Sequence, residues 1–307
     1  MRVLLFILCL VLGQGAAFAQ RTSDFVLSKT IGGDIADFTV DNLGNIYVLT
    51  GENQLKKLSP AGDSLAVFND VRRFGKVSLV DVTNPLKIVV YYREFTMVIE
   101  LDRFLNIVNT IDLRKLNILQ ARAVGLAYDN NVWVYDELDA KLKKIGDDGS
   151  LVDQTTDFRL LFDSTPEPSV LRDQGGFVYL YDTARGVYIF DHYGGLKNHI
   201  ALLGWKDFDV LDKNLLGRDD RSFLRYQQGT LDVQEEPMPA YALDALRIKI
   251  MPSAIYVLNR AGLQIYTNEV EASIAFSIAS RSNVLSAVNG TLITFVPSCS
   301  ACFSKSS

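Results

Sequence analysis

Histidine and cysteine are scarce in this chain, which has two histidines and three cysteines among its 307 residues. Because His192 and His199 are the only histidines, a metal site built mainly from imidazoles is excluded. A Ser–His–Asp system would need one of them beside an activated serine, and no G-x-S-x-G motif nominates that serine. The sequence also lacks a P-loop and a G-x-G-x-x-G motif that opens a helix. We therefore expect no catalytic centre, no metal site and no cofactor.

An excess of positive charge and long apolar segments are also missing. Lys and Arg total 31 against 36 Asp and Glu, which gives a net charge of −5. Proteins that bind nucleic acid usually carry a basic surface, so no nucleic-acid partner is expected. Beyond the start of the chain, no stretch approaches the roughly 20 apolar residues of a membrane-spanning helix. The sequence therefore predicts a soluble protein that does not span a membrane.

Residues 1–19 have the pattern of a cleavable secretory signal peptide. A short basic start precedes an apolar run at residues 3–12, and residues 17–19 have the A-x-A form of a cleavage site. The mature chain is then expected to begin at Gln20. An uncleaved membrane anchor is the alternative, although the apolar run is short for a span. We expect an exported protein, in the periplasm in preference to the extracellular medium.

Two cysteines, Cys299 and Cys302, remain after removal of that peptide, in the sequence Cys-Ser-Ala-Cys. An exported protein meets an oxidising environment, so a local disulfide between them is predicted. A redox-active pair would instead need its first cysteine at the N-terminus of a helix. The Ser-rich tail at residues 297–307 shows no helical pattern, which favours the structural disulfide.

A polar turn followed by a short strand rich in aromatic and β-branched residues is the clearest internal pattern. Residues 41–45 (DNLGN) lead into residues 46–49 (IYVL), and the pattern recurs roughly every 32 to 46 residues. Strands of this kind are expected at residues 46–49, 88–91, 132–135, 177–180, 223–226, 254–257 and 291–295. A later turn glycine repeats too, because Gly62 and Gly149 are separated by 87 residues, the length of two such units.

Seven turn–strand pairs at the period of a four-stranded blade predict an all-β fold, a β-propeller with seven blades in a single domain over residues 20–296. Residues 24–31 form an additional strand that is expected to complete the last blade and close the ring, so that no sheet edge stays open. Six blades with a C-terminal hairpin are the alternative. A pair of β-sandwiches is the competing fold, although it gives no reason for a constant 87-residue offset. The best helix candidate is short, at residues 114–123.

The first repeat also resembles a known group of proteins. Residues 41–48 (DNLGNIYV) and residues 55–63 (LKKLSPAGD) are similar to a blade of NHL-type and related soluble bacterial β-propellers. The resemblance implies the propeller architecture. It does not select an activity, because such propellers include binding modules, scaffolds, lactonases and lyases.

Two other functions remain open beside a binding role. A Ca²⁺-dependent propeller hydrolase or lyase would need several oxygen ligands around the central channel. Asp41, Asp129 and Asp173 recur at matching positions, but aspartates in turns usually bond their own backbone two residues on. A carbohydrate-binding propeller would need exposed aromatic pockets. Only Trp133 and Trp205 are present, and Trp133 is expected in the core.

Arginine and aromatic residues cluster in two predicted loops and at one nearby corner. Such residues are enriched at the centres of protein interfaces. The candidate interface residues are Arg72, Arg73, Phe74, Arg218, Arg221, Arg225, Tyr226 and Trp205. The sequence therefore favours a non-enzymatic exported propeller that binds another protein, as a scaffold or accessory subunit of a cell-envelope or secretion complex. An outer-membrane or secretion-machinery component is the expected partner.

Overall fold

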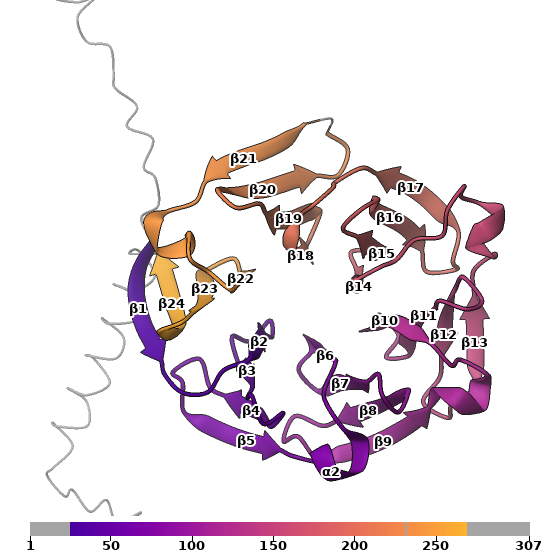
Figure 1. Cartoon of the computed structure of the whole chain (residues 1–307), viewed down its shortest axis with the longest axis horizontal. Helices are drawn as coiled ribbons and strands as arrows, with labels where there is room; N and C mark the ends of the chain where they lie inside the picture. Colours follow the sequence, from indigo (N-terminus) through magenta and orange to yellow (C-terminus); the bar gives the residue numbers. More distant parts are fainter. Residues whose placement is uncertain (1–24, 231, 269–307) are drawn as a thin grey trace, which may run out of the picture. The chain divides into compact units, whose positions relative to one another are not determined.

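Short strands rich in Val, Ile, Leu and Tyr form six antiparallel sheets of four strands each, arranged as a ring (Figure 1). The computed structural model describes residues 25–230 and 232–268. The predicted signal peptide at residues 1–19, the strand at residues 291–295 and the pair Cys299 and Cys302 lie outside the described residues. So do both ends of the predicted domain, residues 20 and 296. In the described part, no helix is long and apolar enough to cross a membrane.

Each of the first five blades is a run of four consecutive strands. Blade one contains β2 (Asp37–Val40), β3 (Ile46–Leu49), β4 (Leu55–Leu58) and β5 (Ser64–Phe68). Blade two contains β6 (Leu79–Asn84), β7 (Lys87–Tyr92), β8 (Met97–Leu101) and β9 (Ile107–Asp112). Blade three contains β10 (Ala121–Leu126), β11 (Val132–Asp136), β12 (Lys141–Ile145) and β13 (Leu151–Gln154). Blade four contains β14 (Val170–Gln174), β15 (Phe177–Asp182), β16 (Gly186–Asp191) and β17 (Leu196–Ile200). Blade five contains β18 (Lys206–Leu211), β19 (Asn214–Arg218), β20 (Ser222–Gln227) and β21 (Val233–Pro237).

The sixth blade joins the two ends of the described chain. It combines β22 (Arg247–Ile250), β23 (Ala254–Asn259) and β24 (Gly262–Asn268) with β1 (Phe25–Ile31). The sheet order is β1-β24-β23-β22, so β1 is the outermost strand beside β24. The predicted closure of the ring by an N-terminal strand is therefore confirmed. Closure pairs the edge that β24 would otherwise expose.

The β-propeller itself is confirmed, but the predicted number of seven blades is wrong, because residues 25–230 and 232–268 form six. The strand expected at residues 223–226 lies in β20, the third strand of blade five, whereas the second strand is β19. Strand β19 pairs on one side with β18 and on the other with β20. The remaining pair in the count of seven, at residues 291–295, lies outside the described residues.

Helical segments in the described part are single turns between strands. They are α2 (Val71–Phe74), η1 (Leu113–Leu116), η2 (Phe158–Leu160) and η3 (Ala240–Ala242). The helix expected at residues 114–123 is wrong, because only η1 is helical and the chain enters β10 at Ala121. The Asp112 side chain accepts a hydrogen bond from the Arg114 backbone N–H and so caps this one turn.

Burial falls from the second strand of a blade to its outermost strand. All five residues of β11 (VWVYD) are buried, and so are five of the six in β15 (FVYLYD). Both faces of these strands pack against neighbouring blades, so they are continuous apolar runs and not alternating ones. In contrast, all five residues of β21 (VQEEP) are exposed. The core therefore consists of layers between blades, such as the cluster that joins Trp133 to Phe190.

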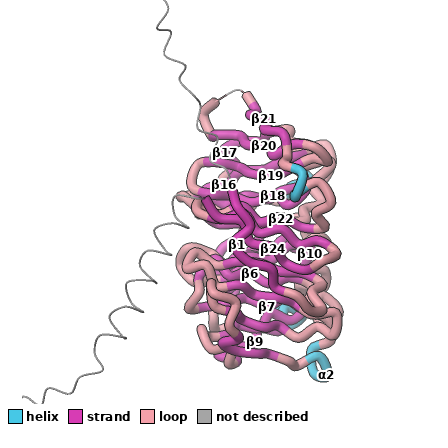
Figure 2. The backbone as a smooth tube through the Cα atoms, turned by 90° about the vertical axis from the view of Figure 1, so that its left-hand side faces the viewer, coloured by secondary structure: helices cyan, strands magenta, loops and turns pink. Residues whose placement is uncertain are grey.

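The antiparallel order gives the ring two different faces. The turns between second and third strands lie on the same face as the connections from one blade to the next, because four antiparallel strands return the chain to that face. We call this the crossover face. It carries α2, which stands out on one side of the ring in the side view (Figure 2). The turns between first and second strands lie on the opposite face.

Candidate functional site

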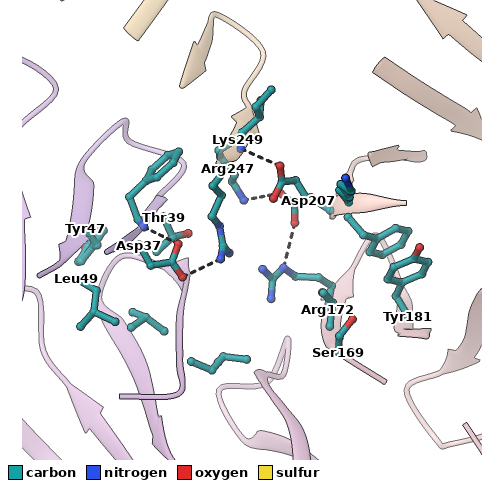
Figure 3. A pocket seen from close by; sticks show the side chains of 18 of the residues that line it. Asp37, Thr39, Tyr47, Leu49, Ser169, Arg172, Tyr181, Asp207, Arg247 and Lys249 are labelled. Atoms are coloured by element: carbon teal, nitrogen blue, oxygen red, sulfur yellow. Dashed lines mark hydrogen bonds and ion pairs between the residues drawn. The ribbon is translucent and has the colours of Figure 1, made fainter. Parts of the chain in front are cut away.

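A cavity of about 410 Å³ lies in the central channel, at the end that belongs to the crossover face. The chain enters each blade from that face and runs first along the innermost strand. The leading residues of several inner strands therefore meet around one space, although they are far apart in the sequence. Asp37, Lys206 and Arg247 begin β2, β18 and β22, and all three line the cavity. Figure 3 shows Asp37 and Arg247 on neighbouring parts of its wall.

An ion pair between Asp37 and Arg247 joins the first and the sixth blade across the cavity wall. The Arg247 Nη1 atom lies 2.7 Å from the Asp37 carboxylate. Both side chains are partly exposed, at 39% for Asp37 and 46% for Arg247. Burial of the carboxyl raises the pKa of Asp37, and the Arg247 guanidinium opposes this shift. The Asp37 carboxylate also accepts a hydrogen bond of 2.7 Å from the Phe38 backbone N–H.

A second carboxylate, Asp209 in β18, links three blades. One of its oxygens accepts a hydrogen bond from Arg172 Nε in β14 at 3.0 Å, and the other accepts one from Lys249 in β22. Burial alone would raise the pKa of Asp209, but the charges and hydrogen bonds of Lys249 and Arg172 lower it to about 2. Asp209 is therefore ionised at neutral pH and holds blades four, five and six together.

Asp207, which lies shortly before Asp209 in β18, is the third carboxylate that links strands around the channel. Its carboxylate accepts a hydrogen bond of 2.6 Å from Arg218 Nε and one of 2.9 Å from the Ile248 backbone N–H. Arg218 Nη2 also donates to the carbonyl of Ala245 at 3.2 Å. These bonds fix the beginning of β22 against blade five. They also satisfy the buried Arg218 guanidinium.

Asp81 in β6 extends the network to blades two and three. Its carboxylate is almost fully buried and accepts a hydrogen bond of 3.0 Å from the Leu126 backbone N–H in β10. It also accepts one from the Thr83 N–H at 2.8 Å, and Arg172 Nη1 lies 4.0 Å away. Polar contacts around the channel therefore reach all six blades.

None of the charged residues that line the cavity is among the eight candidate interface residues. They come from strands separated by tens of residues, so their meeting depends on the closed ring. The sequence does contain one indication of the cavity, because the motif D-F-x-V occurs at residues 37–40 and again at residues 207–210. Both copies form the start of an innermost strand, β2 and β18. In both copies the aspartate binds an arginine of another strand.

The structure divides the eight candidate interface residues into two groups. Phe74, Trp205, Arg218 and Tyr226 are buried, whereas Arg72, Arg73, Arg221 and Arg225 are exposed. The buried residues have internal roles. For example, Phe74 packs on Tyr92 with ring centres 5.4 Å apart, and the Trp205 carbonyl accepts a hydrogen bond from the Tyr181 hydroxyl at 3.0 Å. A protein interface therefore remains a prediction for the four exposed arginines only.

The recurring aspartates do not form one set of calcium ligands. As expected for turns, Asp41 accepts a hydrogen bond from the Leu43 N–H at 2.9 Å, and Asp129 accepts one from the Asn131 N–H at 3.2 Å. Asp173 differs from Asp41 and Asp129, because its carboxylate binds residues of the preceding blade, blade three. Its carboxylate accepts hydrogen bonds from the Tyr128 N–H at 3.1 Å and from the buried Trp133 Nε1 at 3.0 Å. Residues 25–230 and 232–268 contain no group of three His, Cys, Asp or Glu side chains placed to hold a metal ion.

Both histidines contact aromatic rings. His192 stacks on Tyr128 with ring centres 3.8 Å apart, and its Nε2 atom lies 2.8 Å from the Asp173 carboxylate. His199 stacks on Tyr188 at 4.1 Å, and its Nε2 atom lies 2.8 Å from the Arg185 carbonyl oxygen. Within the described part of the chain, neither ring is hydrogen-bonded to a serine hydroxyl. A general base beside a serine nucleophile is thus not formed there.

No model of a protein family and no curated protein matches the sequence. Solved structures do match the fold. A streptogramin B lyase is 12% identical, with a TM-score of 0.55, and the match covers 79% of this chain and 87% of that one. Virginiamycin B lyase from Staphylococcus aureus is 10% identical, with a TM-score of 0.55 and coverage of 80% and 99%.

A third match is the Cps50 (Swd1) β-propeller domain from Myceliophteria thermophila. It is 7% identical, with a TM-score of 0.52, and the match covers 80% of this chain and 99% of that one. Identities this low establish the fold alone, and these neighbours include two lyases. The resemblance to bacterial β-propellers is thus confirmed at the level of the fold.

Proposed function

We propose that this chain is a non-enzymatic, exported β-propeller that binds another protein through its crossover face. It acts there as a scaffold or an accessory subunit of a cell-envelope or secretion complex. The observation that carries the proposal is a series of exposed leucines on this face. Every blade-to-blade connection from blade two to blade six presents at least one.

The leucines project from short connections between buried strands. Leu119 precedes β10 and is 60% exposed, Leu160 lies in η2 and is 78% exposed, Leu203 precedes β18 and is 55% exposed, and Leu246 precedes β22 and is 63% exposed. Single exposed apolar residues are common on protein surfaces. Repetition at four connections of one rigid ring is a different case, because it offers several apolar contacts to one partner.

Charged residues on the same face add to this surface. Arg72 and Arg73 belong to α2, in the connection from blade one to blade two, and Arg221 lies in the turn between β19 and β20. All three are exposed. An interface with apolar contacts and peripheral arginines has the composition typical of protein–protein contacts.

The state of the channel charges supports a role without catalysis. Asp37, Asp207 and Asp209 each bind a cationic side chain of another strand. Carboxylates held in this way connect blades. Asp209, with its pKa of about 2, is in addition a poor general base, because a base needs a pKa near the working pH.

The proposal is tested by comparing two quadruple variants in a pull-down from envelope extracts of the native source. One variant replaces Leu119, Leu160, Leu203 and Leu246 with serine. The matched control replaces four exposed apolar residues of outermost strands, Leu65, Val67, Val108 and Val152, with serine. We expect the unchanged chain and the control to retain a stoichiometric partner and the crossover-face variant to lose it. Equal capture by both variants, or no partner at all, would contradict the proposal.

A further inference from the structure

We infer that the central cavity is a binding site for a carboxylate attached to an apolar group, with the carboxylate held between Arg172 and Arg247. The two guanidinium groups extend toward the middle of the same space from blades four and six (Figure 3). This inference concerns a ligand of the channel and does not require the leucine surface described above.

Five of the six carboxylate oxygens in the cavity lining already accept hydrogen bonds, including one oxygen of Asp207. Both oxygens of Asp209 accept hydrogen bonds, from Arg172 and Lys249. Both oxygens of Asp37 do the same, from Phe38 N–H and Arg247. A cation that entered the cavity would have to displace an arginine or a lysine to reach these carboxylates.

The donors, in contrast, are in surplus. A guanidinium has five N–H groups. Arg247 uses Nη1 for Asp37, and Arg172 uses Nε for Asp209 and Nη1 for the Leu171 carbonyl at 3.0 Å. Among the residues that the structure describes, no hydrogen bond uses Nη2 of either arginine. A carboxylate has two oxygens and can accept one hydrogen bond from each guanidinium.

The charge of the lining favours a single negative charge on the ligand. Four cations, Arg172, Lys206, Arg247 and Lys249, and three carboxylates, Asp37, Asp207 and Asp209, line the cavity. Behind this lining, Asp81 and Asp220 lie beside Arg172 and Lys206, and Arg218 lies beside Asp207. The complete neighbourhood is therefore nearly neutral. A phosphate with two charges would be repelled by the three carboxylates, whereas a carboxylate adds only one charge.

The rest of the wall suits an apolar body. Leu49, Leu55, Leu79, Val80 and Tyr181 line the cavity together with the charged residues. Its volume of about 410 Å³ lies within the range of pockets that hold small organic ligands. The C-terminus of a peptide that ends in an apolar residue and a free organic acid share this chemistry.

Calorimetric titration of the full chain distinguishes these sources. The probes are phenylacetate, phenylacetamide and phenethylamine, and a short peptide that ends in phenylalanine with either a free or an amidated C-terminus. We expect binding only for the probes with a carboxylate. The peptide acid binds more tightly than phenylacetate if the natural source is a chain terminus, and less tightly if it is a small acid.

Arg247→Gln is the informative variant, because Arg247 is half-exposed and Arg172 holds three blades together. We expect it to weaken the binding of the carboxylate probes about tenfold or more, since a hydrogen-bonded charge pair is lost. Arg260→Gln, in the exposed turn between β23 and β24 on the same face but outside the cavity, is the matched control and leaves the affinity unchanged.

Several outcomes would overturn the inference. They are binding of the amide as tight as that of the acid, unchanged affinity in Arg247→Gln, or no binding of any carboxylate at millimolar concentration. Each can occur whether or not a protein partner is captured, so failure of this inference is distinct from failure of the proposed function.

Discussion

Asp37 and Arg247 are 210 residues apart in the sequence and form an ion pair of 2.7 Å between the first and the last blade. Near this junction, on the outside of the ring, β1 completes the sheet that contains β24. The ring is thus closed twice, by side chains at the channel and by backbone pairing at the rim.

Removal of residues 20–31 should open the ring. The chain would lose β1, which has seven residues, and β24 would become an exposed edge. At about 1 kcal/mol for each net hydrogen bond, the free energy of unfolding should fall by about 3 kcal/mol or more. Urea unfolding of this chain and of one that begins at residue 20 measures the difference. Size-exclusion chromatography should also show association through the open edge. A truncated chain that is equally stable and monomeric would show that β1 is not needed for closure.

Replacement of Asp209 by asparagine should destabilise the protein in a pH-dependent way. The pKa of Asp209 is about 2 in the folded protein and 3.8 as its ordinary value. Between these values the unfolded chain binds more protons, so this stabilisation is complete above about pH 5 and is lost as the pH falls toward 2. Its size is about 2 kcal/mol, since one pKa unit corresponds to about 1.4 kcal/mol.

Urea unfolding of the unchanged chain and of Asp209→Asn at neutral pH and at acidic pH checks this expectation. The stability gap between the two proteins should be clear at neutral pH and should narrow in acid. Asp244→Asn, at an exposed position of the connection before β22, is the control and should show no gap. A gap for Asp209→Asn that is constant with pH would contradict the role of its charge.

Asp173→Ala should destabilise the contact between blades three and four. Trp133 Nε1 would lose its acceptor in a position with no solvent exposure, and an unsatisfied buried donor costs about 1–3 kcal/mol. The fluorescence of Trp133 should change as well, since its indole N–H donates to this carboxylate. Asp148→Ala, at an exposed aspartate that accepts a hydrogen bond from Ser150 N–H within its own turn, should change stability by less than 1 kcal/mol. Equal effects of the two substitutions would count against the inter-blade role of Asp173.

If residues 1–19 are a signal peptide, as the sequence predicts, cleavage should give a mature protein that begins at Gln20. Expression of the full chain in an exporting host, followed by N-terminal sequencing and fractionation, tests this. The pattern of residues 17–19 predicts release into the periplasmic fraction. An intact N-terminus in the membrane fraction would instead show the uncleaved anchor.

The propeller could be predicted from the sequence because each blade repeats a local pattern, a polar turn before a buried strand. The seventh pair in the predicted blade count, at residues 291–295, lies outside the described residues. Within the described part, the position of one second strand was also predicted wrongly. In blade five the buried second strand, β19, ends in Arg218. A charged residue is expected on the surface, and only its ion pair with Asp207 explains why it is buried. The sequence pattern therefore favours β20, which contains more aromatic residues, as the second strand of blade five.

The cavity was harder to foresee than the blades. Local patterns place Asp37, Arg172 and Arg247 near the starts of strands, but only the closed ring brings them around one space. The interface candidates show the opposite difficulty. Phe74 and Trp205 stand beside charged residues in the sequence, yet both pack inside, because an aromatic residue in a connection can close the layer between blades.

Crosslinking with mass spectrometry, on the mature protein in its native envelope, tests the binding role most directly. Lys76, Lys115 and Lys206 lie on the crossover face, and Lys213 lies in the turn between β18 and β19 on the opposite face; all four are exposed. If the crossover face binds another protein, the first three lysines crosslink to a single partner and Lys213 does not. Crosslinks from Lys213 alone, or a protein that is recovered without any partner, would contradict the account.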